Sequence, residues 1–314
     1  TNLRFKNRIA MRVLTSHAIL ALLSVSFVGS TVAFTLSRPA ISTFPQKPWS
    51  AVTEPSPFRS TTTPTRLHES TGSGLETAPV ADYDALLKYH AAIAIQMGLI
   101  CGIFKGLDIG VDLVGIQDIP AWGLFPIFYA LSLKSRTLNP LDNQRPNLKN
   151  AVEGEQSRGF GDRAMPSWTP PGPVFPIMWL LVIGPIRAYS SALVWEANGH
   201  HFFDPAILAL MFHLAVGDVW NTMNNSEQRF GASVTGVLCV TASALNAAYQ
   251  YYTVDEFAGN LLGLPMIWFA VAASLITATW KINPDSTTGE LEPLYPTVRE
   301  RKTTFAWFSG SDSE

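Results

Sequence analysis

Pro166-Ser167-Trp168-Thr169-Pro170-Pro171-Gly172 is followed at once by a long apolar run, from Pro173 to Trp195. Two consecutive prolines remove two backbone donors and fix φ, so the chain must enter this run stiff and extended. Proline is tolerated in the first turn of a helix, and a Trp suits the boundary between water and lipid. The heptapeptide therefore predicts a rigid lid that delivers the chain into a membrane-spanning helix.

Composition also favours a membrane protein. Of the 314 residues, 15% are charged and 47% are hydrophobic, which is little charge for a soluble domain. The net charge is −2 and no basic patch is interleaved with aromatic residues, so no nucleic-acid partner is expected. The two cysteines, Cys101 and Cys239, lie in separate apolar segments and form neither a metal-ligand spacing nor a disulfide framework.

The N-terminal region has the features of targeting segments. Residues 1–33 contain basic residues, an apolar run and a small-residue site, which is the order of a secretory signal peptide. Residues 34–80 form a Ser-, Thr- and Pro-rich linker that has a single acid, Glu54, before His68, typical of a disordered plastid transit peptide. Together they predict the two-part address of algae with complex plastids, and hence a plastid membrane. The alternative is a plain secretory or anchoring signal that leads to the endoplasmic reticulum or another endomembrane.

Six apolar stretches follow and predict an all-α membrane bundle. Residues 84–119 carry glycines at four-residue spacing, which form one ridge where another helix can approach closely: Gly98, Gly102, Gly106 and Gly110. Residues 120–133 are interrupted by Pro120 and Pro126, so residues 84–136 form either two spans, which we favour, or one span plus a re-entrant piece. The other four stretches are each about 20 residues, enough to cross a hydrocarbon core of ~30 Å: 173–195, 205–225, 231–252 and 259–280.

Short links between these stretches make sequential helices antiparallel neighbours in an up-and-down bundle. After residue 120, the links that carry Lys and Arg lie on one face: the loop 134–163, the turn at Arg229 and the tail. The opposite links carry acids, among them Glu196 and Asp255, and no Lys or Arg. The lid therefore lies on the basic face, expected to be stroma or cytosol. The polar tail, residues 285–314, is expected to be disordered.

Ionisable side chains at membrane depth are costly, so each marks a candidate site. Arg187 and His213 lie mid-span on neighbouring helices, and no cluster has metal-ligand spacing. Asp218, Asn221 and Asn225 share one helix face, which must point at another helix or a cavity rather than at lipid. Two interpretations stay open: Asp218 pairs with Arg187 or with donors on a neighbouring helix, or Asp218 and Asn221 contact a ligand.

Tryptophan is the second signal inside the bundle. Trp179, Trp220 and Trp268 lie within spans, where the indole N–H needs a partner and the ring makes a flat apolar wall. These rings either pack as core or line a pocket for a flat, mostly apolar ligand such as a tetrapyrrole or sterol, closed by the lid.

With these motifs the chain resembles the TspO/MBR family, the tryptophan-rich sensory or translocator proteins, over about residues 120–284. The family lid Pro-Ser-Trp-x-Pro-Pro-Gly stands at 166–172, and the family's other characteristic residues match Phe175, Trp179, Trp220, Trp268, Trp280, Lys281, Asn283 and Pro284. The resemblance implies a five-helix transmembrane bundle, here with an additional N-terminal membrane helix at 84–119. It also implies binding of porphyrins, haem and, in some members, cholesterol or drug-like ligands. The targeting segments indicate a divergent plastid-type member from an alga.

Several positions depart from the family pattern. Gly217 stands for an Asn and Asn224-Asn225 for two Phe, while Leu275-Ile276-Thr277 lacks the Tyr of a cholesterol-recognition pattern. We therefore expect a more polar pocket than the family's, which argues against cholesterol and favours a porphyrin or another polar-edged ligand.

The predicted function is an integral membrane binding, transport or sensory protein for a tetrapyrrole or lipid-like ligand, with no required cofactor. It is not expected to be an enzyme, because no nucleophile–base pair or metal spacing is found. The expected ligand-binding residues come from the lid, the walls and the polar stripe: Trp168, Pro170, Pro171, Phe175, Trp179, Asp218, Trp220, Asn221 and Trp268. The alternative is a structural or assembly subunit of a plastid membrane complex, docked through the glycine ridge, which would also suit a homodimer.

Overall fold

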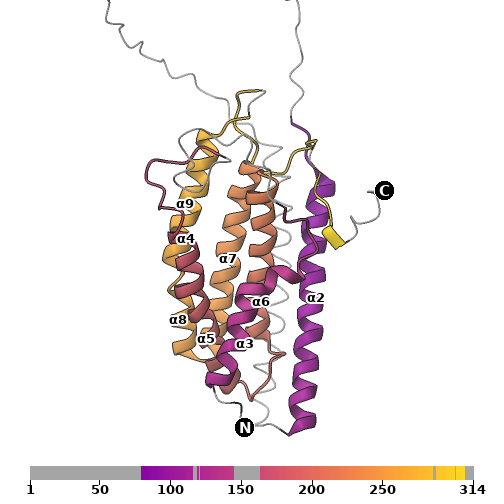
Figure 1. The fold of residues 1–314 in the computed structure, drawn as a ribbon, viewed down its shortest axis with the longest axis vertical. Coiled ribbons are helices and arrows are strands. Elements are labelled where there is room, and N and C mark those ends of the chain that lie inside the picture. The colour runs from indigo at the N-terminus through magenta and orange to yellow at the C-terminus, as the bar shows by residue number, and fades with distance from the viewer. Residues whose placement is uncertain are drawn as a thin grey trace, which may run out of the picture.

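The computed structural model describes residues 79–115, 119, 121–144, 163–285, 288–300 and 302–307. Five long apolar helices in this part can cross a membrane, and they stand side by side as a bundle (Figure 1). The predicted all-α, five-helix fold class is confirmed. The predicted signal peptide, and the transit peptide apart from its last two residues, lie outside the described residues and stay predictions.

Short irregular turns are continuous with some of the spans. The first span is α2 (Tyr83–Val114), and the second joins α4 (Val174–Ile177), the π-helical turn η4 (Met178–Ile183) and α5 (Gly184–Ala197). The third joins α6 (Pro205–Asn221) to a second π-helical turn, η5 (Thr222–Ser226), and the fourth is α7 (Phe230–Val254). The fifth joins α8 (Glu256–Gly263) to α9 (Met266–Ile282) across a break at Pro265.

The two segments before the lid differ in length. The α2 helix ends at Gly115, whose φ of 70° is left-handed and suits glycine, so it stops before the predicted residue 119. The α3 helix (Ala121–Lys134) is about 21 Å long at 1.5 Å per residue, too short to cross the hydrocarbon core. A 3₁₀ turn, η1 (Ser135–Leu138), follows it. Residues 84–136 therefore hold one long span and one short additional helix, not the two spans that we favoured.

The short α3 helix completes the hydrogen bonding of the second span. Pro185 has no N–H to donate five residues back, to the carbonyl of Leu180 in the π-helical turn. Tyr129 of α3 donates its hydroxyl to that oxygen at 2.8 Å. Gly184 makes the approach possible, because a Cβ there would lie 2.9 Å from Cε2 of Tyr129. The π-helical turn around Trp179 is thus fixed by a neighbouring helix.

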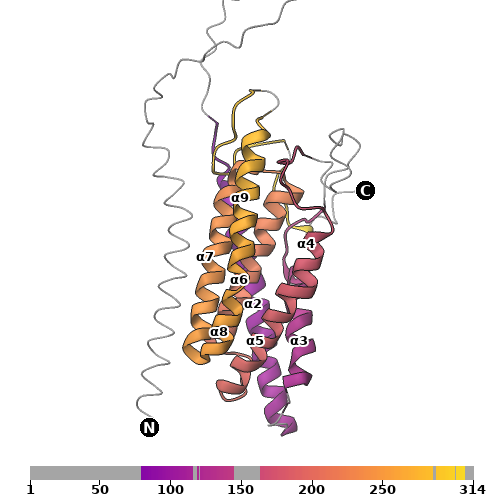
Figure 2. The ribbon, with the colours of Figure 1, turned by 90° about the vertical axis from the view of Figure 1, so that its left-hand side faces the viewer.

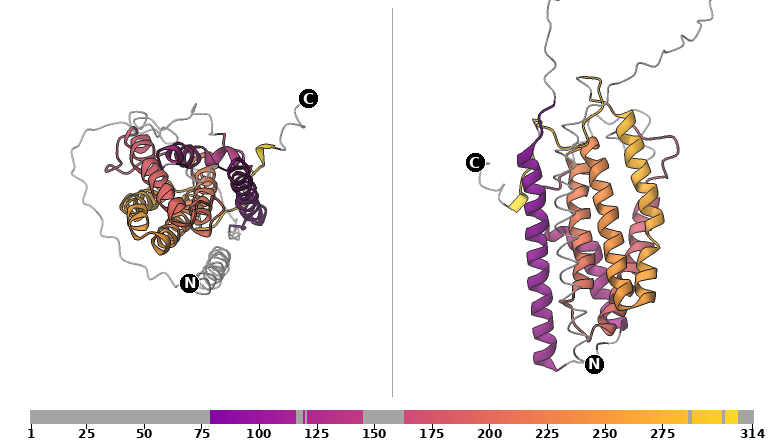
Figure 3. Two further views of the ribbon diagram at one scale, coloured as in Figure 1. Left: turned by 90° about the horizontal axis from the view of Figure 1, so that it is seen from below. Right: turned by 180° about the vertical axis from the view of Figure 1, so that it is seen from behind.

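The C-terminal segment folds onto the lid end of the bundle, beside the start of α2 (Figure 3). Arg229 donates from Nη1 to the carbonyl of Thr297 at 2.6 Å, and Trp280 donates from Nε1 to the carbonyl of Glu292 at 2.9 Å. The prediction that residues 285–314 are disordered is therefore wrong for residues 288–300 and 302–307. Side chains of the bundle thus donate hydrogen bonds to carbonyl groups of this segment that would otherwise bind water.

The links that carry Lys and Arg and the links that carry acids lie at opposite ends of the bundle, as the charge pattern predicted. The lid, the turn at Arg229 and the C-terminal segment meet at one end, where α9 ends (Figure 2). At the other end Asp108 of α2 accepts hydrogen bonds from the backbone N–H groups of Phe202 and Phe203, at 2.7 and 3.0 Å. This carboxylate ties α2 to the α5–α6 link.

Candidate functional site

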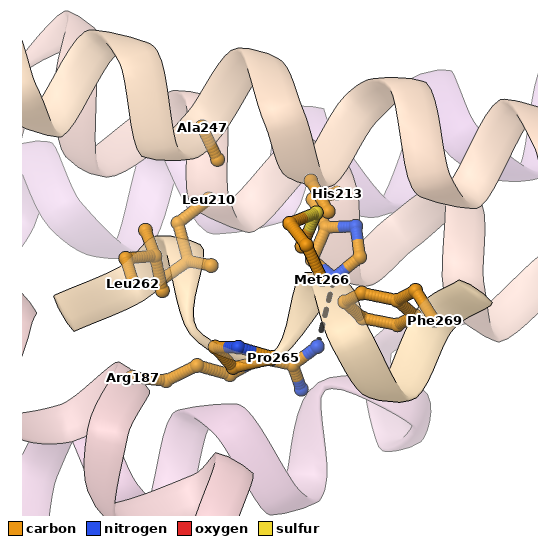
Figure 4. Close-up of a pocket in the computed structure, with 9 residues that line it drawn as sticks. Arg187, Leu210, His213, Ala247, Leu262, Pro265, Met266 and Phe269 are labelled. Carbon is orange, nitrogen blue, oxygen red and sulfur yellow. Dashed lines mark hydrogen bonds between the residues drawn. The ribbon is translucent and has the colours of Figure 1, made fainter. Parts of the chain in front are cut away.

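A small cavity lies where α5, α6 and α7 meet the break between α8 and α9 (Figure 4). Its volume is ≈ 10 Å³, room for about one water molecule. Two polar side chains, Arg187 and His213, line it. The rest of the wall is apolar: Leu210, Ala244, Ala247, Leu262, Pro265, Met266 and Phe269.

Arg187 and His213 form a buried polar pair in this wall. Nη2 of Arg187 donates to Nε2 of His213 at 2.7 Å, and the two residues are 7% and 3% exposed. A guanidinium can only donate, so Nε2 must accept. Nδ1 of His213 lies 3.2 Å from the carbonyl of Val240, which can only accept, so Nδ1 carries the proton. His213 is therefore a neutral imidazole that orients Arg187 without neutralising it.

Aromatic pairs extend from this cavity toward the lid, between the second span and α9. The Trp179 and Phe269 ring centroids lie 6.0 Å apart, and those of Phe175 and Trp268 lie 5.7 Å apart with their planes at 63°. The guanidinium carbon of Arg187 lies 5.3 Å from the Trp179 ring centroid, within cation–π range. We call the four aromatic residues the aromatic seam. Three of the predicted ligand-binding residues come together in it: Phe175, Trp179 and Trp268.

Trp220 joins the seam from the α6 side. Its ring packs with Trp179 against the cluster that contains Phe269, and its Nε1 donates to the carbonyl of Ser233 at 3.1 Å. Gly236 lets α7 come close, since a Cβ there would lie 2.8 Å from Cδ1 of Trp220. An interior indole N–H was predicted to need an acceptor, and for Trp220 a backbone carbonyl provides it.

Asp218 and Asn221 lie away from the cavity wall. Oδ2 of Asp218 accepts hydrogen bonds at 2.8 Å from Nε2 of Gln96 on α2 and from Oγ of Ser135. Oδ1 of Asn221 accepts from Nδ2 of Asn225, one helical turn on, at 2.6 Å. The geometry matches the interpretation that Asp218 pairs with donors on a neighbouring helix. A ligand contact by either residue stays a prediction.

The lid is a tight turn fastened to the end of α9. The backbone N–H and the hydroxyl of Thr169 both donate to the carbonyl of Pro166, at 3.0 and 2.6 Å, and the N–H of Val174 donates to the carbonyl of Pro171. Pro170 is half-buried, whereas Trp168 is 50% exposed and Pro171 is exposed. Just before the turn, Asn283 exchanges two hydrogen bonds with the backbone of Ala164, at 2.9 and 3.0 Å.

Sequence reasoning named only Arg187 and His213 as candidate site residues among those that line the cavity, and two of the residues it missed shape the site. Phe269 is adjacent to Trp268 and contacts both Trp179 and His213, and Pro265 lines the cavity at the helix break. A one-residue step on a helix turns a side chain by 100°, so the break decides which of two adjacent aromatics faces inward. In the described part of the chain, no group of three His, Cys, Asp or Glu side chains could hold a metal ion.

The chain is similar to known membrane proteins over the range that contains the lid and the site. Residues 148–281 match the TspO/MBR family. Protein CrtK of Rhodobacter capsulatus is 26% identical over 127 residues, covering 38% of this chain and 74% of that protein. Translocator protein of Sus scrofa is 26% identical over 135 residues, covering 42% of this chain and 79% of that protein. The matched range includes the lid and every span except α2, which precedes it together with α3. From residue 148, in the loop before the lid, to residue 281, near the end of α9, the chain is therefore similar to the TspO/MBR family.

Proposed function

We propose that this membrane protein binds a flat, largely apolar ligand in the aromatic seam, with a tetrapyrrole as the leading candidate, and transports or senses it. The observation that carries the proposal is the pair of ring contacts between the second span and α9, beneath the lid. Similarity to the TspO/MBR family supports a role in binding or transport, and one relative is named a translocator protein.

The seam suits a planar ligand because the space between the two helices is filled by ring contacts, which a flat ring system could replace. Each aromatic pair contributes about 0.5–1.5 kcal/mol beyond burial, and a ring system inserted between the two helices would replace those contacts with stacking of its own. The cavity of ≈ 10 Å³ holds no porphyrin, so binding requires Trp179 and Phe269 to separate. In this proposal the lid closes the end of the seam, and the hydrogen bond from Asn283 to the carbonyl of Ala164 holds the chain just before it.

Quenching of Trp fluorescence by protoporphyrin, with the protein in lipid nanodiscs, tests this function. We expect saturable quenching that weakens after Trp179→Phe or Trp268→Phe. Trp122→Phe is the matched control, because Trp122 is 80% exposed at the far end of the bundle, on α3. Quenching that does not saturate, or that all three variants retain equally, would remove the proposal.

The proposed location is a plastid membrane, reached through residues 1–80, with the endoplasmic reticulum or another endomembrane as the alternative. Fusing residues 1–80 to a fluorescent protein in an alga with complex plastids separates the two. Plastid fluorescence is expected, and a reticular pattern would favour the alternative.

A second candidate function is a structural or assembly subunit of a membrane complex. One observation favours it: a Cβ built on Gly98, Gly102, Gly106 or Gly110 meets nothing within 4 Å, so the glycine ridge of α2 is open in the structure. Co-migration with a large complex on a native gel, lost after Gly102→Leu with Gly106→Leu, would support it. Migration at the size of a monomer or homodimer would not.

A further inference from the structure

Arg187 holds a positive charge that no contacting carboxylate balances. The ion pairs among the described residues involve Lys88, Arg229 and Arg299, and none includes Arg187. Within the same residues its guanidinium makes one hydrogen bond, to neutral His213, although it has five N–H groups to donate. A buried charge is normally paired, so this arrangement is costly unless something else supplies the anion.

Asp218 lies near enough to act electrostatically on Arg187, but it makes no hydrogen bond or ion pair with it. Its Oδ2 already accepts two hydrogen bonds, from Gln96 and Ser135, on the side of α6 that faces α2. Aromatic contact with Trp179 stabilises the guanidinium but leaves its charge in place. The remaining wall of the cavity beside Arg187 is apolar and offers no acceptor.

We propose that Arg187 is the anchor for a carboxylate carried by the ligand. A guanidinium presents N–H groups in a planar fork that matches the two oxygens of a carboxylate. The cavity in front of it is the size of one small polar group, and the aromatic seam runs from it toward the lid. An acidic, planar molecule would place its carboxylate at Arg187 and its ring system between Trp179 and Phe269.

This inference rests on the proposed function and narrows its ligand class. It selects a tetrapyrrole with free propionate groups over its ester, and over a sterol, which has no carboxylate. His213 is a positioning residue in this scheme, because Val240 and Ser243 fix its ring and it in turn holds Nη2 of Arg187.

The test compares protoporphyrin with protoporphyrin dimethyl ester, which keeps the ring and removes the charge. Affinity is measured by Trp quenching in nanodiscs of one neutral lipid. Native protein is expected to bind the free acid about ten- to a hundredfold more tightly than the ester, the range expected for charge-assisted hydrogen bonds. Arg187→Gln should abolish that preference by weakening binding of the free acid much more than binding of the ester. Lys105→Gln, an exposed charge on α2, is the matched control and should retain the preference.

Each other outcome overturns the inference. Equal binding of acid and ester by the native protein removes the carboxylate anchor and leaves the proposed function standing. Equal loss of acid and ester in Arg187→Gln gives Arg187 a structural role only. Binding of neither compound removes the proposed function as well. If Arg187→Gln does not fold, the acid–ester comparison in native protein and in Arg187→Lys still decides, because Lys keeps the charge and loses the fork.

Discussion

Gln96 of α2 donates a hydrogen bond from Nε2 to Oδ2 of Asp218 on α6 at 2.8 Å, and its own Oε1 accepts one from Asn139 at 2.8 Å. Gln96 is fully buried. Gln96→Leu therefore leaves the half-buried carboxylate of Asp218 and the buried amide of Asn139 each short of a partner. We expect a loss of about 1–3 kcal/mol in the free energy of unfolding, measured in detergent by thermal or denaturant unfolding. Leu99→Ala, on the exposed side of the same helix, should change stability less. Unchanged stability in Gln96→Leu, with weaker porphyrin binding, would instead make Asp218 a ligand contact.

Arg229 is the centre of the network that holds the C-terminal segment. It lies 2.8 Å from carboxylate oxygens of both Asp82 and Glu227 and is 1% exposed. Arg229→Met leaves two carboxylates without their cation, and removing one partner of a buried pair costs about 3–5 kcal/mol. We expect a lower melting temperature and faster hydrogen exchange at residues 288–300. Lys302→Met, on an exposed residue of the same segment, is the control. Slow exchange in both variants would contradict the role of Arg229.

The charge of Arg229 is also insensitive to pH. Burial alone would lower its pKa, but the nearby Tyr89, Glu227 and Asp82 outweigh burial and raise the pKa above its ordinary value. A cation whose folded-state pKa is raised contributes stability that is fully present below its unfolded pKa. Alkaline conditions within the usual working range should therefore leave the exchange protection of residues 288–300 intact.

The α7–α8 corner depends on a glycine. A Cβ on Gly259 would lie 2.3 Å from both Cα and N of Tyr252, which are backbone atoms and cannot rotate away. Gly259→Ala should cost about 1–3 kcal/mol, as overpacking does, or more. Gly263→Ala in the same helix meets nothing within 4 Å and should cause no loss. Similar melting temperatures for the two variants would show that α8 shifts freely.

The sequence predicts the long spans well because their ends carry local signals. The predicted stretch 205–225 is the helix Pro205–Ser226, and Asp204 caps it by accepting from the N–H of Ala206 at 2.8 Å. Which helix a polar stripe faces is not local information. Asp218 turned out to face Gln96, 122 positions earlier in the chain. The ordered C-terminal segment likewise depends on Arg229, far from it in sequence.

The pair of hydrogen bonds between Asn283 and Ala164 is expected to control how fast a ligand enters the seam. Asn283 accepts from the N–H of Ala164 at 3.0 Å and donates to its carbonyl at 2.9 Å, so one side chain joins the approach to the lid to the end of α9. Asn283→Ala removes both bonds while leaving the seam rings in place. We expect faster association and faster dissociation of protoporphyrin in stopped-flow quenching, each by about tenfold, with little change in affinity. Lys281→Ala, an exposed residue two positions earlier, should leave both rates as they are. Unchanged rates in Asn283→Ala would show that these hydrogen bonds do not control ligand entry. A large loss of affinity would mean that the lid contacts the ligand directly, as predicted for Trp168, Pro170 and Pro171.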